Sequence, residues 1–307
     1  MKKFTIDFVS KRLFFASLSG LFVLVSIALL ATKGLTFGID FSGGTLLEFR
    51  TYENQTIQQV RAKLDQTELT GYTLQEYGAQ NEFVVKLADK ISDNAVAENI
   101  VAKLGAELRR LEYVGPQIGK ELAEKGLLAT IVALIAILIY ISARFQLRFA
   151  LGAVIALFHD VVVTLGMFVV LGKEFSLPVL AAVLTIIGYS LNDTIVVYDR
   201  IRENMEDNDD EDNLGTTINR SINETLRRTL ITSITTFVVL LSLYLFGGQS
   251  INDFAFTLLF GVVVGTYSSI FVASPVLLYL RKLAPKPKQE QEAELEDFTR
   301  FNEAQDD

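Results

Sequence analysis

Six long apolar runs constrain this 307-residue chain more than any other feature of its sequence. Each run approaches the roughly 20 residues that an α-helix needs to cross a bilayer, and half of all residues are hydrophobic. The runs therefore predict a polytopic α-helical membrane protein. We place its six transmembrane helices at residues 13–32, 126–142, 150–171, 178–198, 229–246 and 254–280.

Lysine and arginine are distributed unevenly between the segments that join these runs, and this bias sets the orientation of a membrane protein. One side receives most of them, whereas the short loops of the other side hold only Lys173. We therefore expect both termini in the cytoplasm, with the first run as an uncleaved anchor. The cytoplasmic segments are then the N-terminus at 1–12, a loop at 199–228 and an acidic tail at 281–307.

Residues 33–125 separate the first two runs and are expected on the opposite, extracytoplasmic side. Segments rich in strand formers alternate there with segments that have helical spacing of apolar residues. The order βαββαβ predicts an inserted α+β domain of the ferredoxin-like type, a fold that hosts many functions and identifies none. Its elements are a strand at 45–50, a helix at 56–64, two strands flanking 79–81, a helix at 94–108 and a strand at 109–115.

The fourth run contains an acid: "GYSLNDTIVVYDR" (188–200) places Asn192 and Asp193 among apolar residues. A charged side chain at mid-bilayer costs about 2.5–3.5 kcal/mol on insertion scales, so its presence indicates a partner or a use. Burial and a nearby cation move the pKa of a carboxyl in opposite directions, and a balance between them would allow reversible protonation. The alternative is a structural carboxylate bonded to hydroxyls or backbone of a neighbouring helix.

Two further polar sites accompany Asp193. Arg228 opens the fifth run and either anchors that helix at the membrane surface or reaches inward to pair with Asp193. Arg227 competes for the inward role, about 100° around the helix. His159 and Asp160 lie near the middle of the third run, as a proton-relay pair or as a hydrogen-bonded pair that fixes helix packing. A chain with one histidine and no cysteine offers no multi-histidine or thiolate metal site.

The sixth run carries small residues at a strict spacing of four, a pattern that lets another helix approach closely. Contact within this chain and contact with a partner subunit both fit the pattern. The residues of this row are Gly261, Gly265, Ser269 and Ala273.

The segment "FGIDFSGGT" (37–45) holds Asp40, Gly43 and Gly44, which we expect to form a tight turn before the first strand. It lacks the pattern of a phosphate-binding loop, and the acidic run at 206–212 lacks the spacing of a calcium loop. The net charge of −8 is concentrated in that run and in the tail, which are typical of solvated segments. We therefore expect no bound cofactor and no nucleic-acid partner.

Several strings together resemble one family. "FGIDFSGGT", "EYVGPQIGKEL" (112–122), "ALFHDVVVT", "IGYSLNDTIVVYDRIREN" (187–204) and "RRTLITS" (227–233) are similar to the SecF branch of the SecD/SecF family of protein-export membrane proteins. The resemblance runs from about residue 10 to residue 282 and leaves the acidic loop and tail unexplained.

This resemblance implies half of an RND-type bundle in the bacterial plasma (inner) membrane, with SecD as its partner. The two subunits would use the proton motive force to promote export of unfolded preprotein through SecYEG and its associated Sec membrane subunits, after the ATP-driven step. Protons are then the coupling ion, and the chain is not an enzyme. Asp193 and Arg228 fall on residues that the family associates with proton conduction, and Asn192, His159 and Asp160 remain relay candidates.

Two alternatives stay open. The chain could be half of an RND-type exporter of small molecules or lipids, although such pumps usually carry both halves in one chain. It could also be a scaffold without proton chemistry.

Overall fold

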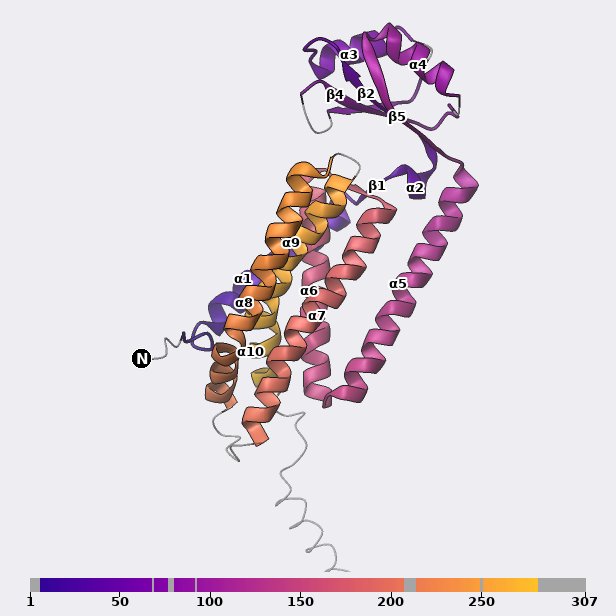
Figure 1. Cartoon of the computed structure of the whole chain (residues 1–307). Helices are drawn as coiled ribbons and strands as arrows, with labels where there is room; N and C mark the ends of the chain where they lie inside the picture. The colour runs from indigo at the N-terminus through magenta and orange to yellow at the C-terminus, as the bar shows by residue number, and fades with distance from the viewer. Residues whose placement is uncertain are drawn as a thin grey trace, which may run out of the picture.

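The computed structural model describes residues 6–67, 69–76, 80–91, 93–206, 214–248 and 251–280. Residues 207–213 of the predicted cytoplasmic loop and the predicted acidic tail at 281–307 lie outside the described residues. Figure 1 shows a bundle of long helices with a small α/β domain at one end.

Six helical segments within the described part of the chain are long and apolar enough to cross a membrane. The sixth is composite, because a π-helical turn separates two α-helices. In chain order the six are α1 (Arg12–Thr32), α5 (Pro116–Arg144), α6 (Leu147–Leu171), α7 (Leu177–Glu206), α8 (Leu214–Phe246), and α9 (Asn252–Ser268) followed by the π-turn η3 (Ser269–Ala273) and α10 (Ser274–Tyr279).

Several helices are longer than the apolar runs that predicted them. α5 begins at Pro116, so the expected domain boundary at residue 125 falls inside a helix; proline suits the first helical position because its φ is already helical. The expectation of a loop at 199–228 is wrong for most of its length, since α7 and α8 occupy it. Polar contacts stabilise these extensions, as where Asn204 Nδ2 donates to Ser221 Oγ over 2.8 Å.

The inserted domain is a four-stranded antiparallel sheet with two helices. Its strands lie in the order β3-β4-β2-β5, so that β2 pairs with both β4 and β5. The elements follow one another as β2 (Gly44–Thr51), α3 (Ile57–Leu64), β3 (Thr73–Glu76), β4 (Glu82–Leu87), α4 (Asn94–Lys103) and β5 (Ala106–Val114).

The predicted helix at 94–108 is wrong in its last residues. α4 ends at Lys103, and Ala106 already begins β5. Gly105 between them has a φ of +68°, and a glycine with positive φ commonly terminates a helix because it avoids the steric penalty of a Cβ.

One face of the sheet forms the domain core. Leu47 and Phe49 of β2 and Phe83 of β4 point into it and meet Val60 and Val101 from the two helices. Figure 1 shows α3 and α4 on the face of the sheet that is turned away from the helical bundle. The opposite face of the sheet is therefore turned toward the bundle.

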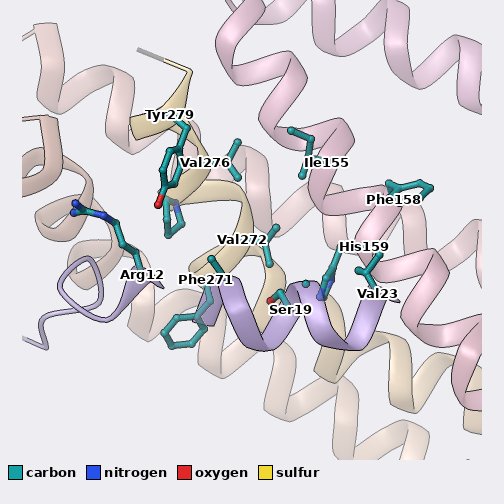
Figure 2. A pocket seen from close by; sticks show the side chains of 13 residues that line it. Arg12, Ser19, Val23, Ile155, Phe158, His159, Phe271, Val272, Val276 and Tyr279 are labelled. Carbon is teal, nitrogen blue, oxygen red and sulfur yellow. The ribbon is translucent and has the colours of Figure 1, made fainter. Parts of the chain in front are cut away.

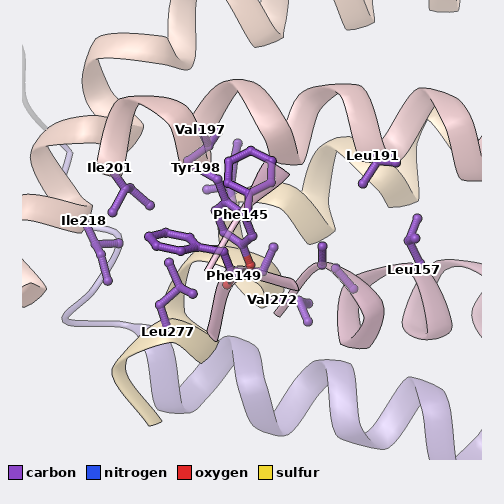
Figure 3. Packing of buried hydrophobic residues seen from close by; sticks show 14 of the residues in the cluster. Phe145, Phe149, Leu157, Leu191, Val197, Tyr198, Ile201, Ile218, Val272 and Leu277 are labelled. Carbon is purple, nitrogen blue, oxygen red and sulfur yellow. Dashed lines mark hydrogen bonds between the residues drawn. The ribbon is translucent and has the colours of Figure 1, made fainter. Parts of the chain in front are cut away.

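The bundle is organised around α9, which packs against α6, α7 and α8, while α1 packs on α6. α5 stands apart (Figure 1), with only a few buried residues. At the end of the bundle farthest from the inserted domain, the rings of Phe145, Phe149 and Tyr198 pack together (Figure 3), and those of Phe149 and Tyr198 have centroids 5.2 Å apart. The Tyr198 hydroxyl donates to the Ala273 carbonyl over 2.9 Å, which ties α7 to the π-turn.

Candidate functional site

Asp193 lies on the inner side of α7 and is 3% exposed. Its Oδ2 accepts a long hydrogen bond of 3.4 Å from Ser233 Oγ on α8. Ser233 in turn accepts a hydrogen bond of 2.7 Å from Thr266 Oγ1 on α9. Two successive hydroxyl groups thus link α9 and α8 to the Asp193 carboxyl by hydrogen bonds. These bonds offset part of the cost of burying a carboxyl in the membrane.

Arg228 lies on α8, and its charge acts on the Asp193 carboxyl. The two side chains form no ion pair within the part of the chain that the structure describes; the direct partner of Asp193 is Ser233. Arg227 and Arg228 are both exposed. The structure therefore places Arg228 within electrostatic range of Asp193 without direct contact.

Asn192 points away from this site, because its side chain is exposed whereas that of Asp193 is buried. Successive helical residues are rotated by about 100° around the axis, and here that rotation turns Asn192 outward while Asp193 faces the bundle. The structure does not bring Asn192 together with Asp193.

His159 and Asp160 form a second buried cluster. Asp160 is 1% exposed, and its Oδ1 lies 2.9 Å from His159 Nδ1. Its Oδ2 accepts hydrogen bonds from Ser190 Oγ of α7 over 2.5 Å and from Ser268 Oγ of α9 over 2.7 Å. One carboxyl of α6 thereby connects three helices, an arrangement that satisfies its lone pairs as burial requires.

The two clusters are close along α7. Ser190 and Asp193 are three residues apart, which is about 4.5 Å along the helix axis. On α9, Thr266 belongs to the Asp193 cluster and Ser268, two residues later, belongs to the Asp160 cluster. Helices α7 and α9 therefore carry both clusters at neighbouring levels, and a shift of one helix past the other would alter both.

The row of small residues faces the interior of this chain. All four of its members are buried. A Cβ built on Gly261 would overlap the Ile186 side chain, and one on Gly265 would lie 2.9 Å from Ser190 Cβ. The first two members thus allow α9 to approach α7 closely, next to the Asp160 cluster, and Ser269 and Ala273 continue the row into the π-turn.

The glycine turn connects α1 to the inserted domain. Gly43 and Gly44 have φ of +71° and +117°, and a Cβ on Gly44 would lie 2.6 Å from the Leu87 carbonyl oxygen. Asp40 Oδ2 accepts a hydrogen bond of 2.9 Å from the backbone N–H of Leu177, the first residue of α7. The prediction of a turn holds for Gly43 and Gly44 but not for Asp40, which belongs to the four-residue helix α2 (Ile39–Ser42) and bonds directly to the helix that carries Asp193.

Two further contacts join the domain and its linker to the same rim of the bundle. The short strands β1 (Thr36–Phe37) and β6 (Glu174–Phe175) pair in parallel, and Lys86 of β4 forms an ion pair with Glu174. Burial lowers the pKa of Lys86 to about 8, against the negative charges of Asp253 and Asp40, which raise it.

Sequence reasoning did not identify Tyr267 and Ser19, which extend the second cluster. The Tyr267 ring stacks on His159 with centroids 6.0 Å apart, and its hydroxyl lies 2.8 Å from Ser19 Oγ of α1. A serine within an apolar run is a weak signal, because such hydroxyls usually bond to their own helix.

The fold and these clusters define a multi-pass α-helical membrane protein that contains buried carboxyl groups and an inserted α/β domain. The family model "Protein export membrane protein SecD/SecF, C-terminal" matches residues 95–283, and the "SecD/SecF GG Motif" matches residues 28–51. The chain belongs to the SecD/SecF family of protein-export membrane proteins.

Individual relatives agree with this assignment. "Protein translocase subunit SecF" of Magnetococcus marinus is 50% identical over 302 residues, covering 92% of this chain and 96% of the relative. The subunit of the same name from Vibrio alginolyticus is 43% identical over 291 residues, with 90% and 91% covered. Their names describe translocase subunits, which is a transport role in protein export.

A solved structure shares the fold. The crystal structure of SecDF from Thermus thermophilus, described as a translocon-associated membrane protein, has a TM-score of 0.82 and 35% sequence identity. It covers 91% of this chain, whereas this chain covers 39% of that longer protein. The chain thus corresponds to less than half of SecDF.

Proposed function

We propose that this chain is the SecF subunit of a SecD–SecF complex that uses the proton motive force to promote preprotein export through SecYEG after the ATP-driven step. The observation that carries this proposal is the buried Asp193 carboxyl, bonded to a hydroxyl and within range of Arg228. An intramembrane acid of this kind is by default a functional residue. The names of the relatives and the longer SecDF chain support the assignment.

The proposed contact with SecD lies on the outer face of α7 and α8. Thr185, Gly188 and Asn192 are exposed at helical spacing on α7, and Arg228 and Thr232 are exposed on α8. Polar groups are costly against lipid and are usually found at helix–helix contacts or beside aqueous paths. This chain is accordingly half of an RND-type bundle whose second half covers this face.

The inserted domain is proposed to be ferredoxin-like, extracytoplasmic and in contact with unfolded preprotein. The βαββαβ order and the strand order β3-β4-β2-β5 support the fold type. The lysine and arginine bias supports cytoplasmic termini in a bacterial inner membrane. A domain between two spans then emerges on the side where exported protein leaves the channel.

Coupling between protons and movement follows from the contacts of α7. Protonation of Asp193 removes its charge, weakens its attraction to Arg228 and lets its hydroxyl group donate a hydrogen bond. A potential of 100 mV contributes about 2.3 kcal/mol for each charge that crosses the membrane, which is enough to bias two packed arrangements. Because Asp40 holds the first residue of α7, a shift of this helix is transmitted to the turn that leads into the domain.

Proton conduction by the assembled SecD–SecF complex in vesicles tests this proposal. We expect Arg228→Ala and Asp193→Asn to abolish conduction, and Arg228→Lys to retain part of it because the positive charge is kept. Arg227→Ala is the matched control, since it removes an adjacent exposed arginine on a different face, and it should conduct normally. Undiminished conduction by Arg228→Ala would favour a scaffold without proton chemistry.

A further inference from the structure

A groove separate from the Asp193 site opens along α1, with a volume of about 270 Å³. α1, α6 and the π-turn with α10 form its walls (Figure 2). Its lining is almost entirely apolar and includes Ala16, Gly20 and Val23 of α1, Ile155 and Phe158 of α6, and Val276 of α10.

The groove has the length of one leaflet of a membrane. Arg12, Ala16, Gly20 and Val23 lie on one face of α1 at intervals of four, four and three residues. Val23 is eleven residues beyond Arg12, which corresponds to about 16 Å along the helix axis, and half of a typical hydrocarbon core measures about 15 Å. The groove therefore runs from one membrane surface to about the middle of the bilayer.

The groove is accessible from the lipid side. Ile155 and Phe158 are 42% and 56% exposed although they belong to a membrane-spanning helix. Gly20 leaves room because a Cβ built there would meet no atom within 4 Å. An occupant can therefore enter sideways from the bilayer, and an apolar chain matches the lining.

The two ends of the groove differ in polarity. At the beginning of α1, the half-buried side chain of Arg12 forms no ion pair with any described residue, and the Tyr279 hydroxyl belongs to the same wall (Figure 2). At the inner end, His159 presents the ring edge that is not bonded to Asp160. A cation at the surface end of an apolar groove complements an anionic headgroup that carries a long chain.

We propose that this groove binds one anionic glycerophospholipid. Its phosphate pairs with Arg12, and one acyl chain lies along α1 between Ile155 and Val276 as far as His159. The chain then separates His159 and Asp160 from water on this side of the bundle. A zwitterionic lipid with the same acyl chains also fits the groove, but its headgroup is attracted less strongly to the positive charge of Arg12.

Native mass spectrometry of the full chain in detergent tests the proposal, with phosphatidylglycerol and phosphatidylcholine of identical chains as probes. We expect Gly20→Leu to abolish retention of phosphatidylglycerol, because leucine fills the groove. Ser17→Leu, on an exposed part of α1 outside the groove, should retain it. We expect Arg12→Gln to lower the affinity for phosphatidylglycerol about fivefold, so that phosphatidylglycerol no longer binds more tightly than phosphatidylcholine. Lys11→Gln should change neither the affinity for phosphatidylglycerol nor this preference.

Thermal unfolding of each variant checks that the bundle is intact. Equal lipid retention by folded Gly20→Leu and Ser17→Leu would overturn the proposal. It would also be overturned if glycerol phosphate, which has no acyl chain, protected the protein from unfolding as well as phosphatidylglycerol. A copurifying single-span protein in place of lipid, lost in Gly20→Leu, would identify the groove as a protein interface and contradict the lipid assignment.

Discussion

Gly261 shows how the absence of one methyl group lets helix α9 pack closely against α7. Its Cα faces Ile186 so closely that a Cβ would overlap that side chain. We expect Gly261→Ala to lower the free energy of unfolding by about 1–3 kcal/mol, the usual cost of overpacking, even though alanine is the better helix former. Thermal unfolding in detergent measures the effect.

Gly188 provides the control for this variant. It lies on the exposed face of α7, and a Cβ there would meet nothing within 4 Å. Gly188→Ala should leave the isolated chain as stable as before or raise its stability by up to about 1 kcal/mol. Equal destabilisation by the two variants would contradict the close packing of α9 on α7.

The candidate acids could be predicted from sequence, whereas their partners could not. Asp193 and Asp160 stand out because apolar surroundings make any carboxyl conspicuous. Serine and threonine occur throughout these helices, and most bond to the preceding turn, as Thr232 does to the Arg228 carbonyl. Only tertiary packing selects Ser233 as the hydroxyl that reaches a carboxyl of another helix.

The contact between β4 and the rim of the bundle is expected to depend on pH. Docking lowers the pKa of Lys86 from its ordinary value of 10.5 to about 8 because the contact buries it, although its ion-pair partner Glu174 and the nearby Asp253 and Asp40 oppose this decrease. Between these two values the docked state binds fewer protons, so docking releases a proton and becomes more favourable as pH rises. Below pH 8 both states are protonated and the dependence disappears.

Energy transfer between dyes on Tyr52→Cys in the domain and Leu171→Cys at the end of α6 measures docking, in a chain without other cysteines. The docked fraction should rise between about pH 8 and pH 10 in the parent chain. Lys86→Met should abolish this rise, and Lys90→Met, which removes an exposed lysine of the same domain, should preserve it. A rise that persists in Lys86→Met would assign the titration to another group.

Some elements can be predicted from local sequence, whereas others depend on contacts between distant parts of the chain. The strand-forming residues of β2 and the capping box of Thr56 and Gln59 at the start of α3 are local signals, and both elements appear near the expected positions. The pairing of β1 with β6 joins two-residue strands that are far apart in sequence, so no local pattern predicts it. The ends of α7 and α8 depend on contacts between the two helices, which hydropathy does not report.

At the scale of the whole molecule, long-range contacts attach the inserted domain and its linker to the beginning of the helix that carries Asp193. Asp40 bonds to the beginning of α7, and Lys86 pairs with Glu174 in the segment just before it. If the proton-driven step moves the domain relative to the bundle, fixing this contact must block the step. A thiol crosslinker between Lys86→Cys and Glu174→Cys should therefore leave basal, ATP-driven export intact and remove its stimulation by an inward proton gradient.

The same double variant under reducing conditions controls for loss of the ion pair itself. Linking two sites inside the domain, Arg109→Cys and Glu107→Cys, controls for chemical modification, because these neighbours already pair across 3.6 Å on one strand. Both controls should keep the response to the gradient. If the crosslinked rim also keeps the response, the domain does not need to leave the bundle, and any movement coupled to protonation of Asp193 is confined to the helices.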